Sequence, residues 1–507
     1  MNTLCIVNGT DVSEYAQLGA FDGESACDRV RRYVDALSTP AHVICKPAAR
    51  TLYPDTWSSD VRESWNIAGL FDALRQAGAG YDAIVVVPGD APFLDPELCR
   101  TMIEKHRKYF VEYSFADGFP AAVSPEILST RILARLADLA TGDTRAVGRD
   151  AIFSVVQKDI NAFDVETEIS AVDLRMLRIT LACDTRNNFV VCKNLHDHGM
   201  LSSTASIIET IEKYGTALRG VPTYAAIQIA DGFIPTVYDP FANDGRDAKT
   251  STTMPVDRVE RVIDEVLTMS PECVIAMSLY GDVVRYTAIE ELIAVCAARP
   301  NASFIFETAG VGWENPDRVA QASAENISWI VVLDADDPEV YRAIRGDGYD
   351  DAIGFAEIFI DLVPERTWVQ ATRMKLNEEH LDGFFRRWSE RYRKSVGLDP
   401  SAVGTPSHVI IQKHDHYCGR LPDRRVCDLS PVKRYPCWHV KRDVNILLDG
   451  TVVLCREDLD REHVLGNIFD DGIEAAWSGG ATYHEMHVRG AYPRLCEKCD
   501  EYYTFNF

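Results

Sequence analysis

The chain has 507 residues, 46% of them hydrophobic, which is enough for two to four domains with substantial cores. Its formal net charge of −25 repels phosphate backbones and anionic lipids, so we expect no nucleic-acid and no membrane partner. The N-terminus, "MNTLCIVNGTD", lacks the basic start of a signal peptide. We therefore expect a cytoplasmic protein whose 14 cysteines are thiols or metal ligands, with a protein or small-molecule partner that the sequence does not identify.

Residues 1–215 alternate short apolar runs with helical patterns, which predicts an α/β sheet domain with helices on its faces. The run "YDAIVVVPGD", residues 81–90, is almost continuously apolar and predicts a buried central strand. Asp95 and Pro96 are typical of a helix start. Further strands are expected at residues 3–7, 41–45 and 178–184, and helices at residues 24–37, 65–77 and 95–110.

Residues 216–412 show a regular alternation of six apolar runs with helical patterns between them. This order predicts a parallel barrel or part of one, whose chemistry lies in the loops at the carboxyl ends of the strands. The expected strands are residues 223–230, 272–279, 302–308, 328–334, 367–374 and 407–412.

Residues 413–507 are rich in loops and contain six cysteines. "VNILLDGTVVLC" is two apolar runs joined by Asp449-Gly450, a strong hairpin signal. Cys437 lies before this hairpin, Cys455 ends it, and Cys496 and Cys499 form a Cys-x-x-Cys pair. Four such cysteines can hold a [4Fe–4S] cluster or a Zn²⁺ ion, and the spacing leaves both open. The other two, Cys418 and Cys427, are either reserve ligands or ordinary thiols.

The same segment resembles a SPASM domain, the iron–sulfur extension of many radical S-adenosylmethionine (radical SAM) enzymes. The resemblance rests on Cys437-Trp438, the Asp449-Gly450 turn, Leu465-Gly466-Asn467, Trp477 and the terminal Cys-x-x-Cys. It implies that Cys437, Cys455, Cys496 and Cys499 hold one auxiliary [4Fe–4S] cluster.

Residues 216–412 then resemble the radical SAM partial (β/α)6 barrel that precedes such a module. In that family the loop after the first strand carries Cys-x-x-x-Cys-x-x-Cys, and these thiolates leave one iron open for S-adenosyl-L-methionine. Here Gly232, Thr236 and Asp239 occupy the three positions. None is a thiolate, which is the ligand such clusters select. We expect a vacated cluster site and no cleavage of S-adenosylmethionine, with a hard cation at Asp231 and Asp239 as the other interpretation.

Residues 1–215 resemble nucleotide-sugar cytidylyltransferases in "YDAIVVVPGDAPFLDPEL" and "LRITLACDTRNN". The resemblance implies that Asp90 and Asp184 bind Mg²⁺ beside nucleotide phosphates. The Gly-rich basic loop of that family is replaced by "NGTDVSEYAQLGAFDGES", which carries four acids and would repel a triphosphate.

The whole arrangement resembles the spirochaete-type SPASM protein family. Three functions follow as hypotheses: an iron–sulfur protein on a degenerate radical SAM scaffold, a nucleotide-sugar nucleotidyltransferase using its N-terminal domain, or a zinc-stapled binding protein. We favour the first. Whether the chain is an enzyme is left open by the sequence.

Overall fold

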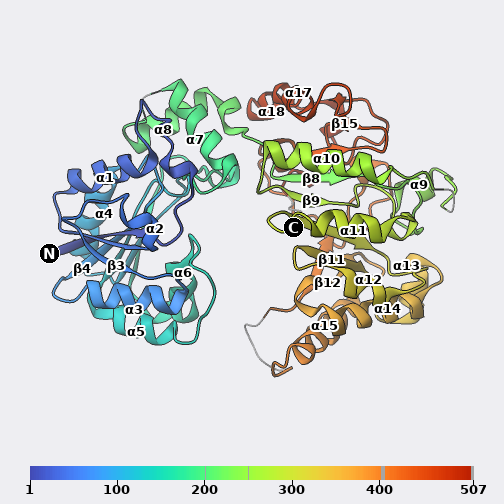
Figure 1. Ribbon diagram of the computed structural model, residues 1–507, viewed down its shortest axis with the longest axis horizontal. Coiled ribbons are helices and arrows are strands. Elements are labelled where there is room, and N and C mark those ends of the chain that lie inside the picture. The colour runs from blue at the N-terminus through green and yellow to red at the C-terminus, as the bar shows by residue number, and fades with distance from the viewer. Residues whose placement is uncertain (200, 249–250, 401–405, 504–507) are drawn as a thin grey trace. The chain divides into compact units, whose positions relative to one another are not determined.

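A computed structural model describes residues 1–199, 201–248, 251–400 and 406–503 (Figure 1). The chain divides into two compact units, Met1–Gly220 and Val221–Phe507. The predicted barrel and the predicted C-terminal module lie together in the second unit. Among the described residues, no helix has the length and apolar character needed to cross a membrane.

The first unit is built on a seven-stranded sheet in the order β3-β2-β1-β4-β6-β5-β7. The strand predicted to be central, β4, lies in the middle between β1 and β6. The strands are β1 (Thr3–Gly9), β2 (Ala41–Cys45), β3 (Ser58–Val61), β4 (Ala83–Pro88), β5 (Tyr113–Asp117), β6 (Glu126–Ser129) and β7 (Val165–Ile169).

Helices cover both faces of this sheet, as its side-chain alternation requires. Ile6 and Ile84 pack with α3 (Ile67–Ala77) and α5 (Leu133–Leu139), whereas Cys5 and Val85 pack with α1 (Ala26–Leu37) and α4 (Pro96–Tyr109). Figure 1 shows the two helix pairs on opposite sides of the strands. The other α-helices of this unit are α2 (Pro47–Arg50), α6 (Ala151–Val156), α7 (Arg186–His198) and α8 (Thr204–Lys213).

The strand expected at residues 178–184 is wrong. This segment makes one isolated bridge, Ala121 to Thr180, and Cys183 donates its backbone N–H to the carbonyl of Asp90. Its residues are buried because the segment passes under α7, so burial rather than strand pairing explains the apolar run. Strands β3, β5, β6 and β7 were not expected, since they are short and partly exposed.

The second unit contains the six predicted barrel strands, in chain order along one sheet and all parallel. They are β8 (Tyr224–Ile227), β9 (Val274–Ala276), β10 (Ser303–Thr308), β11 (Ile327–Val332), β12 (Thr367–Arg373) and β13 (Val409–Lys413). The helices between and beside them are α9 (Pro240–Asn243), α10 (Val256–Met269), α11 (Ile289–Ala297), α12 (Pro316–Ala322), α13 (Pro338–Arg345), α14 (Tyr349–Leu362) and α15 (Leu381–Ser395).

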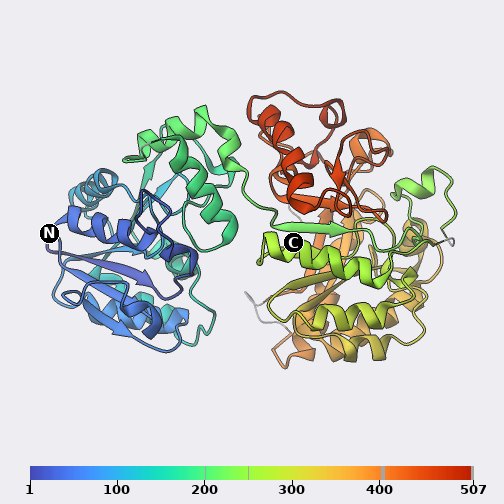
Figure 2. The same ribbon diagram turned by 45° about the horizontal axis from the view of Figure 1, so that its top comes forward.

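The predicted hairpin is present and extends the barrel sheet. Strand β14 (Asp443–Ile446) pairs in parallel with β8 and antiparallel with β15 (Thr451–Val453), which pairs with β16 (Val464–Asn467). Figure 2 shows this C-terminal segment beside β8. Gly450 has φ 84°, as the turn requires. Helices α16 (Trp438–Arg442), α17 (Ile473–Gly479) and α18 (Ala481–Val488) complete the segment.

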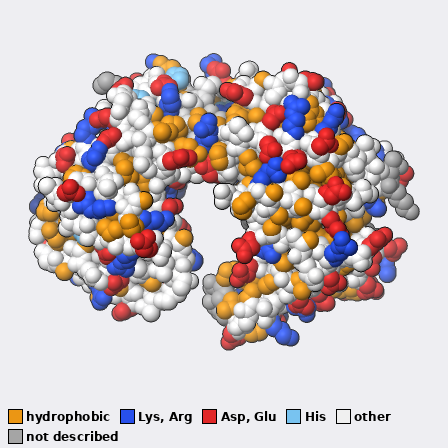
Figure 3. All heavy atoms as spheres, in the orientation of Figure 1, with side chains coloured by type: hydrophobic (Ala, Val, Ile, Leu, Met, Phe, Trp, Pro, Cys, Tyr) orange, Lys and Arg blue, Asp and Glu red, His pale blue; other side chains and the backbone are white. Residues whose placement is uncertain are grey.

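The described surface of the second unit has a mixed charge pattern. On the face drawn in Figure 3, acidic and basic side chains are interspersed among apolar ones. Many of the acids are paired, for example Asp264 with Arg299 and Asp361 with Arg391. The acid excess of the chain therefore does not gather into one patch on this face.

Candidate functional site

The four predicted cysteine ligands come from three segments of the second unit. Cys437 immediately precedes α16, Cys455 follows β15, Cys496 ends a short 3₁₀ turn, and Cys499 lies three residues later. Cys437, Cys455 and Cys496 are buried, and Cys499 is half-buried. The fold thus brings residues from positions 437 to 499 into one neighbourhood.

Neighbouring acids and thiols affect the ionisation of the cysteines. The pKa of Cys455 is raised well above its usual value, first by burial, then by Glu457, and then by the other three cysteines. Backbone N–H groups of Val440 and His439 act on the sulfur of Cys437, and Glu501 donates its N–H to Sγ of Cys499 at 3.3 Å. Thiolates in such a setting favour a bound cation that replaces the lost hydration.

A compact group of polar side chains flanks Cys418 and Cys499 in the sequence. Among the described residues, the one group of three His, Cys, Asp or Glu side chains with ligand atoms within 4.8 Å of one another is Asp415, His416 and Asp500.

A fifth cysteine joins the four predicted ligands. Cys499 lies close to the Cys418 thiol and is the main cause that raises the pKa of Cys418, followed by burial. Cys418 has φ 55°, a left-handed backbone in the middle of the short turn Tyr417–Gly419. Cys427, in contrast, is exposed. Position in the sequence could not separate these two cysteines, since neither has a close cysteine neighbour along the chain.

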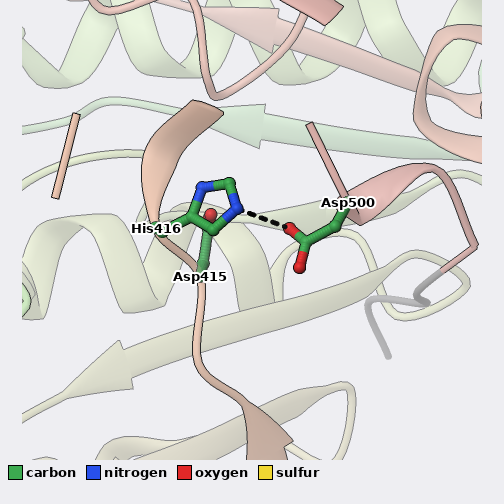
Figure 4. Close-up of side chains that lie close together, drawn as sticks. All are labelled: Asp415, His416 and Asp500. Carbon is green, nitrogen blue, oxygen red and sulfur yellow. Dashed lines mark ion pairs between the residues drawn. The ribbon is translucent and has the colours of Figure 1, made fainter. Parts of the chain in front are cut away.

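The group Asp415, His416 and Asp500 is an ion-pair network rather than a good metal site. Figure 4 shows the His416 ring directed at Asp500, with Nε2 at 3.6 Å from Oδ1. Nδ1 of His416 accepts the Gly419 N–H at 2.9 Å, so the proton of the neutral ring is on Nε2, where a metal would need a lone pair. Asp500 is already neutralised by Lys413 at 2.9 Å and Arg425 at 2.5 Å.

The loop after β8 is organised by its own polar groups. Asp239 caps α9, accepting the N–H groups of Phe241 and Ala242 at 2.8 Å each. Thr236 Oγ1 accepts the N–H of Tyr238 at 3.2 Å. A Cβ on Gly232 would lie 2.9 Å from Cβ of Ser251, so a larger side chain there requires movement. Each of the three positions is therefore used in local structure.

Tyr238 ties this loop into the barrel. Its hydroxyl donates to Oδ2 of Asp334 at 2.7 Å, and the same oxygen pairs with the Arg345 guanidinium. The other oxygen of Asp334 accepts the N–H of Thr372 at 2.8 Å. Asp334 is fully buried with φ 65°, and Arg345 is 8% exposed. The loop, β11, β12 and α13 are thus joined by one buried network.

A cavity of about 220 Å³ opens within the second unit, inside the barrel. Its walls come from the loop after β8, the ends of the barrel strands, and the segment that bears the cysteines. Glu307 on β10 faces it, and burial raises the pKa of this carboxyl although Arg456 opposes the shift. Two further lining residues are neighbours of cysteines in the sequence: Arg456 directly follows Cys455, and Tyr417 directly precedes Cys418. The cysteine group and the cavity are therefore neighbours.

In the first unit, Asp90 and Asp184 lie close together, but a guanidinium bridges them. Arg149 contacts Asp90 with Nη2 at 2.6 Å and Nη1 at 3.3 Å, and Asp184 with Nε at 2.8 Å. Burial raises the pKa of Asp90 despite this cation. Burial would also raise the pKa of Asp184, but Arg149 and Asn188 outweigh it and lower that pKa. No sequence motif pointed to Arg149, because it lies in a loop.

Comparison with known families assigns both ends of the chain. SPASM, an iron–sulfur cluster-binding domain, matches residues 437–500, and a MobA-like NTP transferase domain matches residues 17–158. A Treponema pallidum (strain Nichols) protein described as uncharacterized is 35% identical over 372 residues, covering 70% of this chain and 98% of the relative. The chain belongs to this spirochaete-type SPASM protein family.

Solved structures give weaker similarities. A cytidylyltransferase from Leptospira borgpetersenii shares 16% identity over 43% of this chain and 97% of its own, with a TM-score of 0.35. Streptococcus suis SuiB bound to S-adenosylmethionine shares 14% over 74% of this chain and 89% of its own, with a TM-score of 0.39. The spirochaete-type SPASM protein combines a MobA-like NTP transferase domain and a SPASM domain in one chain, with a sheet of six parallel strands between them in the sequence.

Proposed function

We propose that this SPASM protein holds one auxiliary [4Fe–4S] cluster on Cys437, Cys455, Cys496 and Cys499. The observation that carries the proposal is the convergence of these cysteines, three of them buried, within the segment matched by SPASM. When bound, the cluster supplies one-electron chemistry or a rigid staple for a loop-rich segment. The match of this segment to an iron–sulfur cluster-binding domain favours it over the alternative, a single zinc ion.

The barrel, in this proposal, does not generate radicals from S-adenosylmethionine. Gly232, Thr236 and Asp239 offer no thiolate, and each is engaged in a turn, a cap or close packing. Iron–sulfur clusters need soft sulfur ligands, so a cluster with an open iron has no holder in this loop. The barrel cavity then serves as a binding site next to the auxiliary cluster, which suits an electron-transfer or redox-sensing role.

The test is quantification of iron, sulfide and zinc in the full chain purified without oxygen. We expect about four irons and four sulfides per chain, lost in the double variant Cys496→Ser/Cys499→Ser. The control is Cys427→Ser, which removes an exposed cysteine and should keep the full content. One zinc per chain without iron would instead support the zinc-stapled protein, and about eight irons would contradict an empty barrel.

A second candidate function lies in the first unit, whose residues 17–158 match the MobA-like NTP transferase domain. It predicts Mg²⁺-dependent binding of a nucleotide near Asp90. A thermal-shift series with CTP or UTP and Mg²⁺ tests it, with Asp90→Ala as the comparison. A shift in the native chain that Asp90→Ala abolishes supports this function, and no shift with either nucleotide counts against it.

A further inference from the structure

Arg149 occupies the space between the two carboxylates that a catalytic metal of a nucleotidyltransferase would need. Asp90 follows β4, Asp184 precedes α7, and Arg149 precedes α6, so three segments meet at this point. All three guanidinium nitrogens point at carboxylate oxygens, at 2.6 to 3.3 Å. This fork matches carboxylate geometry and makes the pairing specific.

No carboxylate oxygen at this point is left without a hydrogen bond. Both oxygens of Asp90 contact Arg149. Oδ2 of Asp184 contacts Arg149, while Oδ1 accepts from the Thr185 N–H at 2.9 Å and the Asn188 side chain at 2.8 Å. A divalent cation on the same oxygens would have to displace the guanidinium, because two cations there would repel each other.

The loop that carries Arg149 is anchored on the same unit. The N–H groups of Ile67 and Ala68 at the start of α3 donate to the carbonyls of Arg145 and Asp143, at 3.0 and 3.1 Å. Asp143 also pairs with Lys158 at 3.1 Å. Arg149 is therefore held from both sides of its loop and is not a freely swinging side chain.

The phosphate side of the pocket also departs from a metal–nucleotide site. The first basic residue after β1 is Arg29, and its guanidinium lies over the rings of Phe21 and Phe93 at 5.2 and 5.7 Å. It is paired with Glu24 at 3.5 Å and Asp22 at 3.7 Å. Arg29, the side chain that would bind a triphosphate, is therefore already paired with these two acids.

We propose that Arg149 is a built-in counter-cation that replaces Mg²⁺, so that Asp90 and Asp184 bind no divalent ion in the native chain. The nucleotidyltransferase-like domain then holds its two acids ionised without metal. This inference goes beyond the iron–sulfur proposal, does not depend on the cluster, and opposes the Mg²⁺-dependent alternative.

Titration of the full chain with Mn²⁺, followed by the EPR signal of free Mn²⁺, tests the inference. The native chain should bind no Mn²⁺ at Asp90, so Asp90→Asn should not reduce its Mn²⁺ binding. The control Arg145→Ala, a change in the same loop, should behave like the native chain. Arg149→Ala should gain one site at least about tenfold tighter than any site of the native chain. The double variant Arg149→Ala/Asp90→Asn should lose that site.

Two results would overturn it. One is Mn²⁺ binding by the native chain that disappears in Asp90→Asn, which is readable even if Arg149→Ala does not fold. The other is a folded Arg149→Ala, verified by cooperative thermal unfolding, that binds no more Mn²⁺ than the native chain. Arg149→Gln serves as a second variant, since it removes the charge but keeps part of the side-chain volume.

Discussion

Asp334 shows what a single buried charge demands of its neighbours. The carboxylate is fully buried at the end of β11, and its partners are Arg345, Tyr238 and the Thr372 N–H. A buried charge is stable only when it is paired and hydrogen-bonded. Since Tyr238 belongs to the loop after β8, the same pairing fixes that loop against β11.

Removing Arg345 should therefore be costly. Arg345→Met leaves the Asp334 carboxylate buried without its cation, and we expect a loss of about 3–5 kcal/mol in the free energy of unfolding. Arg342→Met is the matched control on the same helix, because the Arg342 side chain is 71% exposed and should cost less than about 0.5 kcal/mol. Urea unfolding of the three proteins gives the comparison, and equal costs for both variants would contradict the account.

Several residues of the candidate sites could be predicted from the sequence, and others could not. Cys496 and Cys499 were found by their spacing, and Asp449-Gly450 located the hairpin that brings Cys455 to them. Cys418, Arg149 and Tyr238 act through partners 81, 59 and 96 residues away in the chain, namely Cys499, Asp90 and Asp334. Such pairings depend on the fold, and no local pattern encodes them.

At the scale of elements, the hairpin of β14 and β15 links the cysteine segment to the barrel. β14 pairs with β8, and Cys455 follows β15, so the hairpin determines where this cysteine lies. Its apolar runs and turn made it predictable. The expected strand at residues 178–184 failed because an apolar run reports burial, and burial alone does not distinguish a strand from a packed irregular segment.

The turn of this hairpin offers a test at the same scale. Gly450 has φ 84°, and a Cβ there would lie 2.3 Å from Cδ2 of Phe469. Gly450→Ala should cost about 2 kcal/mol more than Gly490→Ala, because overpacking adds to the backbone strain. Gly490 has φ 73° with no atom within 4 Å of a Cβ, so Gly490→Ala measures the cost of the backbone strain without overpacking. Thermal unfolding and iron content measure the effect. Equal losses of stability in the two variants would contradict the role of the turn.

At the scale of the molecule, the proposed cluster site and the pair Asp90 and Asp184 lie in different compact units. Every residue proposed for the cluster and every residue that lines the barrel cavity lies in Val221–Phe507, whereas Asp90, Asp184 and Arg149 lie in Met1–Gly220. The predicted boundary between barrel and C-terminal module, near residue 412, falls inside one compact unit because β14 continues the barrel sheet. The alternating pattern of the sequence indicated the barrel, but strand pairing between β8 and β14 is a long-range contact.

This division predicts that residues 221–507 suffice for the cluster. A chain of these residues has its own core and all four cysteines, so it should contain as much iron and sulfide per chain as the full protein. Iron and sulfide quantification after anaerobic purification of both chains checks this. A folded shorter chain without iron would show that the first unit takes part in holding the cluster.

The central claim is a single, fully thiolate-bound cluster beside a barrel that holds none. The most direct test is the EPR spectrum of the reduced full chain, recorded with and without S-adenosylmethionine. The account predicts one [4Fe–4S] signal, unchanged by S-adenosylmethionine and absent in Cys496→Ser/Cys499→Ser. A second signal, or one that S-adenosylmethionine shifts, would mean an iron with an open position and would contradict the account.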